Sequence, residues 1–110
     1  MLVTTLWHVP TSAAIAGHLD TVPANDNLGA KIEGDLLYGL GACDMKGGLA
    51  AQIATAMTVQ TPAVDATYVF YAGEEIAARH NGLLHLFRDR PDLVAGDVAL
   101  LGEPTSAAIE

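Results

Sequence analysis

The chain has 110 residues, room for one domain at most, and its 51% hydrophobic content can support a core. Its 13 acidic residues against 5 basic ones disfavour contact with nucleic-acid phosphates. A single cysteine, Cys43, excludes an internal disulfide, fits a reducing compartment and is expected to be small buried filler. Residues 47–64 lack charge but are too polar for a membrane span, and no basic residue of a secretory signal precedes Lys31. We therefore expect a soluble, cytoplasmic protein with no nucleic-acid or membrane partner.

The first half of the chain predicts a strand, a loop region and a helix. Residues 1–10 match no pattern, whereas residues 12–16 are small and apolar and predict a buried strand. Proline and asparagines then predict a loop over 21–27, and 32–38 predict a hairpin-like piece with its turn at Gly34-Asp35. Glycines predict a tight loop over 39–48, and apolar residues at helical spacing predict a helix over 46–59.

The second half predicts a strand, a helix and a strand. Residues 67–71 are rich in β-branched and aromatic side chains, 81–90 predict a helix that ends before Pro91, and 97–101 predict a last strand. Three side chains of this helix are expected to face inward: Leu83, Leu84 and Phe87. Strands that alternate with helices predict an α/β fold, a mostly parallel sheet with flanking helices.

Four short motifs with acidic residues or histidine stand where these apolar runs stop at a glycine. They are Gly17-His18-Leu19-Asp20, Cys43-Asp44-Met45, Gly73-Glu74-Glu75 and Gly102-Glu103-Pro104. Parallel sheets bind ligands beyond the carboxyl ends of their strands, so the topology gathers these motifs at one edge. One imidazole and five carboxylates are ligands suited to divalent ions, so the sequence predicts a two-metal hydrolase site.

Each motif alone also has a plainer explanation. The His18 and Asp20 pair fits an ordinary polar strand end, and Asp44 fits the N-cap of the following helix. Glu74-Glu75 fits a solvated loop, although two adjacent carboxylates after a buried strand favour a metal ligand beside a proton acceptor. Glu103 alone fits a charged turn residue. The convergence of all four motifs, rather than any one of them, favours the metal site.

The motifs resemble, in order and spacing, those of the co-catalytic zinc aminoacylase/carboxypeptidase superfamily. The stretches that carry the resemblance are Gly-His-Leu-Asp-Thr-Val-Pro (17–23), Gly-Ala-Cys-Asp-Met-Lys-Gly-Gly (41–48), Ala-Gly-Glu-Glu (72–75) and Gly-Glu-Pro-Thr (102–105). Residues 74–83 and 90–97 are most similar to the succinyl-diaminopimelate desuccinylases within it. The resemblance implies a zinc-exopeptidase-like catalytic domain and assigns a role to each candidate residue.

The implied roles involve six residues. His18 and Glu103 bind the first zinc, Asp44 bridges both zincs, Glu75 binds the second, Glu74 is the general base, and Asp20 supports His18. The resemblance also implies a non-proline cis peptide at Asp44-Met45. Two zinc ions are expected, with cobalt or manganese as possible substitutes.

The implied reaction is hydrolysis of N-succinyl-LL-2,6-diaminopimelate to succinate and LL-2,6-diaminopimelate, by a full-length homodimer that acts on small N-acyl amino acids. One alternative stays in the superfamily: an N-acetylornithine deacetylase, or a metal-dependent aminopeptidase or carboxypeptidase. A second alternative is a domain that binds metal without catalysing a reaction.

The ligand set departs from that of the family. The second zinc would have only Asp44 and Glu75, and the family supplies its third ligand from a histidine that follows far downstream. His8 and His80 are weaker substitutes. We therefore expect residues 1–110 to be a partial metallohydrolase catalytic domain, without the lid and dimerisation domain, and inactive alone.

Overall fold

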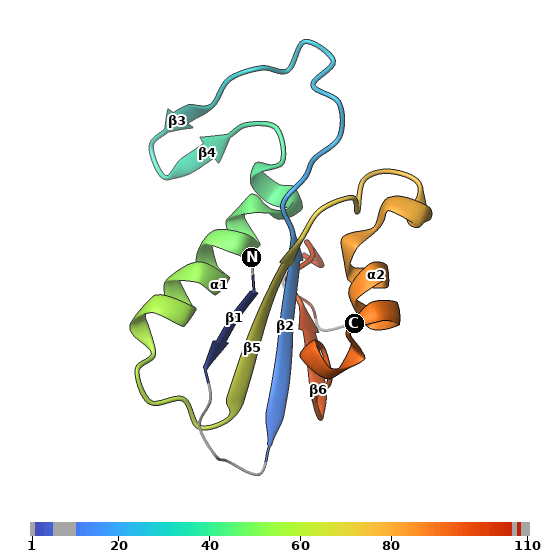
Figure 1. Ribbon diagram of the computed structural model, residues 1–110. Helices are drawn as coiled ribbons and strands as arrows, with labels where there is room; N and C mark the ends of the chain where they lie inside the picture. The colour runs from blue at the N-terminus through green and yellow to red at the C-terminus, as the bar shows by residue number, and fades with distance from the viewer. Residues whose placement is uncertain (1, 6–10, 107, 109–110) are drawn as a thin grey trace.

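A four-stranded sheet in the order β1-β5-β2-β6 forms the centre of the fold (Figure 1). Strands β2 (Ser12–His18), β5 (Asp65–Tyr71) and β6 (Val98–Leu101) run parallel, and β1 (Leu2–Thr5) pairs antiparallel with β5. The computed structural model describes residues 2–5, 11–106 and 108. The predicted α/β fold with a mostly parallel sheet is confirmed, and β1 is a strand that the sequence pattern did not indicate.

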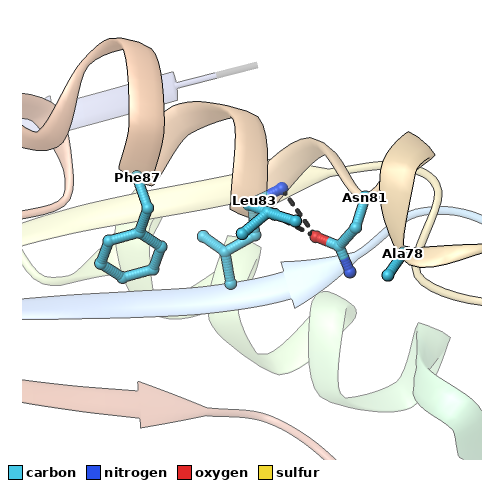
Figure 2. Close-up of a pocket in the computed structure, with 5 residues that line it drawn as sticks. Ala78, Asn81, Leu83 and Phe87 are labelled. Atoms are coloured by element: carbon cyan, nitrogen blue, oxygen red, sulfur yellow. Dashed lines mark hydrogen bonds between the residues drawn. The ribbon is translucent and has the colours of Figure 1, made fainter.

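Two helices flank the sheet, close to their predicted positions (Figure 1). Helix α1 (Gly47–Thr58) follows a short π-helical turn, η1 (Ala42–Lys46). Helix α2 (Gly82–Asp89) begins after Asn81, whose Oδ1 accepts the N–H groups of Leu83 at 3.0 Å and Leu84 at 3.1 Å. This side-chain cap satisfies donors that the first turn of a helix leaves without partners, and it fixes where α2 starts (Figure 2).

Alternate residues of β5 pack under different helices. Tyr68 and Phe70 join Met45 and Leu49 in the cluster under α1. Their neighbours Val69 and Tyr71 form a second cluster with Ala16 and Val94, against which Leu83 and Leu86 of α2 pack. Successive side chains of a strand point to opposite faces, so the two helices cover opposite faces of the sheet.

The inward face of α2 differs partly from the prediction. Leu83 packs on the sheet as expected, but Leu86 accompanies it instead of Leu84, which is 53% exposed. Phe87 points toward the sheet beside Leu83 (Figure 2) yet stays 55% exposed. Phe87 lines a cavity of about 140 Å³ between α2 and the sheet, together with residues of β2 and β6 such as Ala14 and Leu101, so its ring faces a space that the described residues leave open.

The smaller elements lie in the connections. Strands β3 (Lys31–Glu33) and β4 (Leu36–Tyr38) form the predicted hairpin, with its turn at residues 34–35. Two 3₁₀ turns, η2 (Ala78–His80) and η3 (Pro91–Leu93), flank α2.

One expectation for the glycine-rich segment is wrong. The predicted tight loop contains the turn η1, whose backbone angles at Asp44 and Met45 are not helical, and this turn directs Met45 into the core while leaving Cys43 exposed. Cys43 is therefore not buried filler. None of the helices in the described part of the chain has both the length and the apolar composition of a membrane span.

Gly48 marks a close approach between α1 and the end of β6. A Cβ atom at this position would lie 2.6 Å from the carbonyl oxygen of Gly102. Alanine is more favourable than glycine in a helix by about 1 kcal/mol, but a backbone clash at this distance forces the strand end to move.

We expect Gly48→Ala to lower the free energy of unfolding by about 1–3 kcal/mol in a urea titration. Gly39→Ala is the control, since its Cβ would meet neighbours only at 3.6 Å; equal stability of the two variants would contradict the prediction.

Asp97 ties the start of β2 to the segment before β6. Its Oδ2 accepts the N–H of Ser12 at 2.8 Å and the Ser12 hydroxyl at 3.1 Å, and these bonds lower the pKa of Asp97. A lowered pKa stabilises the fold at pH values above the ordinary aspartate pKa of about 3.9, and this contribution is lost as the pH falls through the folded value. The difference in free energy of unfolding between the wild type and Asp97→Asn should therefore shrink on acidification, measured by urea titrations at several pH values. A constant difference would refute this.

Candidate metal centre

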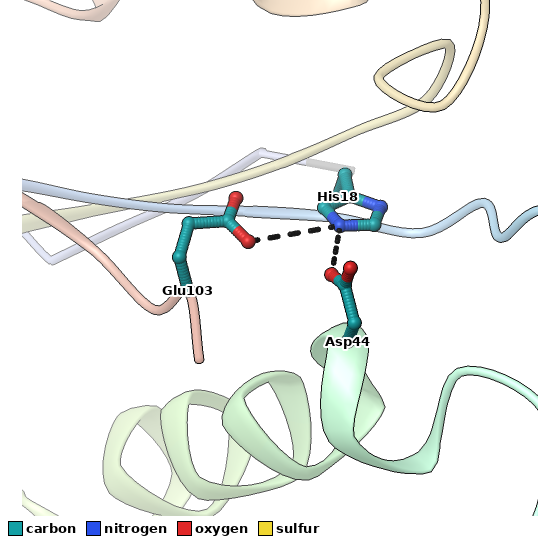
Figure 3. Close-up of side chains that lie close together, drawn as sticks. All are labelled: His18, Asp44 and Glu103. Carbon is teal, nitrogen blue, oxygen red and sulfur yellow. Dashed lines mark hydrogen bonds and ion pairs between the residues drawn. The ribbon is translucent and has the colours of Figure 1, made fainter. Parts of the chain in front are cut away.

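The predicted site residues meet at the carboxyl ends of the parallel strands. His18 is the last residue of β2, and the register Ala16↔Leu101 places Glu103, two residues beyond β6, beside it. Glu74 and Glu75 follow β5 after Gly73. Figure 3 shows His18, Asp44 and Glu103 converging from β2, from the turn before α1 and from the segment after β6. The structure therefore gathers residues from four separate motifs at one edge of the sheet.

His18 is the centre of this arrangement. Its side chain is 1% exposed, and its Nε2 lies 3.0 Å from Oδ1 of Asp44 and 3.9 Å from Oε2 of Glu103. Its other ring nitrogen, Nδ1, lies 3.0 Å from the backbone carbonyl oxygen of Asp20. A carbonyl oxygen can only accept, so Nδ1 carries a proton. Nε2 donates to Asp44 when the ring is protonated, and it offers its lone pair to a cation when the ring is neutral.

The acidic surroundings shift two pKa values in the same direction. Burial lowers the pKa of His18, but the hydrogen bond to Asp44 and the charge of Glu103 outweigh it and raise the pKa above the ordinary value. Burial raises the pKa of Glu103; His18 opposes this, while Asp44, Glu74 and Glu75 add to it. His18 and Glu103 therefore each hold a proton more tightly than the free side chain does.

Two sets of donor atoms are spaced to hold a metal ion. His18, Asp44 and Glu103 form one set, and His18, Glu74 and Glu75 form the other, with the ligand atoms of each set within 4.8 Å of one another. The first set matches the expected first-zinc ligands. The second contains Glu75 together with Glu74, whereas the sequence placed Glu75 with Asp44. An imidazole with carboxylates suits zinc and related divalent metals, so the donor chemistry fits such an ion.

Asp20 contacts His18 through its main chain more closely than through its carboxylate. The sequence assigned its carboxylate to His18, but Oδ1 lies 3.7 Å from Nδ1, and the backbone carbonyl makes the contact with the ring. The carboxylate instead accepts the N–H groups of Gly73 at 2.9 Å, Glu74 at 3.3 Å and Glu75 at 3.2 Å. Burial raises the pKa of Asp20, and these hydrogen bonds lower it further than burial raises it.

Sequence reasoning missed two residues, Met45 and Gln52, that support the site by bonding to the main chain of β2. Met45 is fully buried, and its Sδ accepts the N–H of His18 at 3.2 Å. The peptide Asp44-Met45 is cis, as the resemblance implied. Gln52 of α1 donates from Nε2 to the carbonyl of Ala16 at 3.1 Å, a carbonyl that also accepts the N–H of Gly102. Met45 stood inside a motif and could have been suspected, but Gln52 carried no sequence signal beyond its place on a helix.

Of the two substitute ligands, only His80 can be placed. His80 is exposed and belongs to neither donor set found among the described residues. His8 lies outside the described residues and stays a prediction. His85 is exposed, and its Nε2 lies 2.7 Å from the carbonyl oxygen of Arg79.

The chain is similar to known proteins over most of its length. Residues 14–110 match the model of peptidase family M20/M25/M40. The chain is 50% identical over 96 residues to the protein named DapE in Mycobacterium tuberculosis. This match covers 87% of the chain and 27% of that protein. It is 46% identical over 99 residues to a succinyl-diaminopimelate desuccinylase of Corynebacterium glutamicum, covering 87% and 27% respectively. A desuccinylase of Novosphingobium aromaticivorans is 37% identical over 98 residues, covering 84% of the chain and 26% of that protein. The chain thus spans about a quarter of the length of these relatives.

Metal binding should displace a proton from His18. A divalent ion binds the neutral imidazole, and the raised pKa of His18 keeps the ring protonated to a higher pH than usual. Zinc affinity should therefore rise with pH until the pH exceeds that pKa. Calorimetry in buffers of different ionisation enthalpy should show more proton release at about pH 6 than at about pH 8.

His85→Gln is the matched control, because this exposed histidine belongs to neither donor set. It should leave the proton release unchanged, whereas His18→Gln should remove both the release and most of the affinity. Equal proton release at both pH values in the wild type would contradict the prediction.

Proposed function

This chain belongs to peptidase family M20/M25/M40, and from that premise we propose that it is part of the catalytic domain of a zinc-dependent amide hydrolase. The proposed reaction converts N-succinyl-LL-2,6-diaminopimelate and water to succinate and LL-2,6-diaminopimelate. Relatives at 46% and 37% identity are named for this activity. The proposal includes a small N-acyl amino acid as substrate, a full-length homodimer and a cytoplasmic location.

The observation that carries the proposal is the convergence on Nε2 of His18. This buried nitrogen lies near the carboxylates of Asp44 and Glu103, and His18 belongs to both donor sets. Four carboxylates around one buried imidazole repel one another, so packing alone does not favour the arrangement. A pair of divalent cations would turn the same groups into stabilising ligands.

We assign the ligands as follows. His18 and Glu103 would hold the first zinc, Asp44 would serve both zincs, and Glu75 would hold the second. When bound, the metal pair polarises the amide carbonyl and makes water acidic enough to give up a proton near neutral pH. A catalytic zinc normally has three protein ligands, so the second ion takes a further ligand from residues beyond this chain.

Glu74 is the proposed general base and acid. Its side chain is exposed, so water and substrate can reach it. The neighbouring Glu75 is partly buried and is assigned to metal binding instead. Glu74 accepts a proton as the water oxygen attacks the amide carbonyl carbon. It then gives this proton to the departing amine as the C–N bond breaks, and its carboxylate is restored.

The test is a chimera in which residues 14–110 replace the matching segment of the Corynebacterium glutamicum enzyme. We expect it to hydrolyse the succinyl substrate, and Glu74→Gln should lower kcat by about 10²–10⁴-fold with zinc content unchanged. The 110-residue chain alone, assayed with zinc, should show no turnover at ordinary enzyme rates.

The control is Glu33→Gln, which alters a carboxylate of the β3–β4 hairpin that is paired with Lys31 and belongs to neither donor set. This variant should keep full activity. A chimera that loads zinc but hydrolyses no substrate would favour a non-catalytic metal-binding domain. Preference for N-acetylornithine would instead favour the deacetylase alternative.

A further inference from the structure

The loop that carries Glu74 and Glu75 is held by a single carboxylate. Three successive backbone N–H groups, those of Gly73, Glu74 and Glu75, donate to the side chain of Asp20. Oδ1 accepts from Gly73 and Glu74, and Oδ2 accepts from Glu75. Hydrogen bonds to a charged acceptor are stronger than neutral ones, so this contact dominates the conformation of the loop.

The other side of the loop is confined by backbone. Gly73 has a φ of 85°, in the left-handed region that favours glycine, and a Cβ atom there would lie 2.1 Å from the carbonyl oxygen of His80. The N–H of Gly82 also donates to the carbonyl of Ala72 at 2.8 Å. The loop therefore lies between the start of α2 and Asp20, and the carboxylate of Asp20 holds the main chain from which both glutamate side chains extend.

Asp20 is itself held firmly at the end of β2. The preceding residue, Leu19, donates its N–H to the carbonyl of Tyr71 at 2.7 Å and accepts from Nζ of Lys46 at 3.0 Å. The backbone carbonyl of Asp20 accepts a hydrogen bond from Nδ1 of His18. One residue thus uses its main chain for the histidine and its side chain for the glutamate loop.

We propose that Asp20 is a positioning residue for Glu74 and Glu75, whose carboxylate sets the loop that presents both side chains to the site. The functional consequence rests on the proposed function, in which Glu74 moves protons and Glu75 binds metal. The alternative role, direct support of the His18 ring by the carboxylate, fits less well. Its Oδ1 lies 3.7 Å from Nδ1, beyond hydrogen-bond range, while the carbonyl of the same residue lies at 3.0 Å.

Amide hydrogen exchange of the 110-residue chain, followed by NMR, tests the proposal residue by residue. In the wild type, the amides of Gly73, Glu74 and Glu75 should be protected. Asp20→Ala removes both acceptor oxygens, and exchange at all three positions should accelerate about tenfold or more. Asp20→Asn keeps one oxygen, so the Gly73 and Glu74 amides should stay protected while only Glu75, facing the new NH₂ group, loses protection.

This split distinguishes positioning from a general loss of stability, which would accelerate exchange throughout the sheet. The control is Asp97→Asn, which alters the carboxylate that binds Ser12 at the opposite end of β2 and should leave the three amides unchanged. Unprotected amides in the wild type would overturn the proposal without any variant. Protection that survives in both Asp20 variants would overturn it as well.

Zinc titration of the same samples separates this proposal from the proposed function. In Asp20→Ala, the His18 resonances should respond at the wild-type zinc concentration, because a main-chain carbonyl holds the ring. The Glu75 resonances should need about tenfold more zinc. A weakened response at His18 alone would show that the carboxylate acts on the ring instead. If zinc moves no resonance of the wild type, the proposed function fails, while the exchange data still decide the role of Asp20.

Discussion

The hydrogen bond from Nδ1 of His18 to the carbonyl of Asp20 constrains the whole site. The imidazole is almost completely buried at a strand end, where an unpaired polar atom would be costly. The local carbonyl satisfies one ring nitrogen and fixes the tautomer, so the other nitrogen must find its partner on a different segment. Asp44 and Glu103 meet that need, and the edge of the sheet becomes a point where distant parts of the chain converge.

The packing of Met45 beneath His18 explains why glycines stand in the motifs. The side chain of Met45 lies against Gly17 and Gly102, the residues that precede His18 and Glu103. Its sulfur also accepts the N–H of His18, which links the turn before α1 to the end of β2. Because the side chain of Met45 points into the core, its neighbour Asp44 stays near the surface. Its carboxylate there lies close to Nε2 of His18. The packing of one apolar side chain thus sets the distance between two of the candidate ligands.

Much of this could be predicted from sequence because local patterns determine it. The β-branched run at 67–71 and the apolar spacing in 46–59 specify their elements through side-chain periodicity alone. Motifs at strand ends converge because parallel strands share one carboxyl edge, and this followed from topology without coordinates. The cap of α2 by Asn81 is likewise a local interaction.

The errors come from tertiary context. Which side chains of α2 reach the sheet depends on how the helix lies on it, so Leu86 packs where Leu84 was expected. Cys43 is exposed because the turn η1 directs only Met45 inward, and a glycine-rich stretch does not reveal that geometry. The division of Asp20 between main chain and side chain was also out of reach, because it needs the loop after β5 to lie beside the end of β2.

Charge gives the last link between the fold and the proposed chemistry. The net charge of −8 is unevenly distributed, with five of the acidic side chains gathered around one histidine. Burial raises the pKa of Glu103, and the hydrogen bond to Asp44 and the charge of Glu103 outweigh burial and raise the pKa of His18. Two divalent ions would supply positive charge here and would halve the net charge of the chain. His18 and Glu103 are also assigned to the first ion, so proton and metal compete for the same atoms. The site is therefore built around positive charge, and its geometry is maintained by main-chain contacts that do not depend on which cation is present.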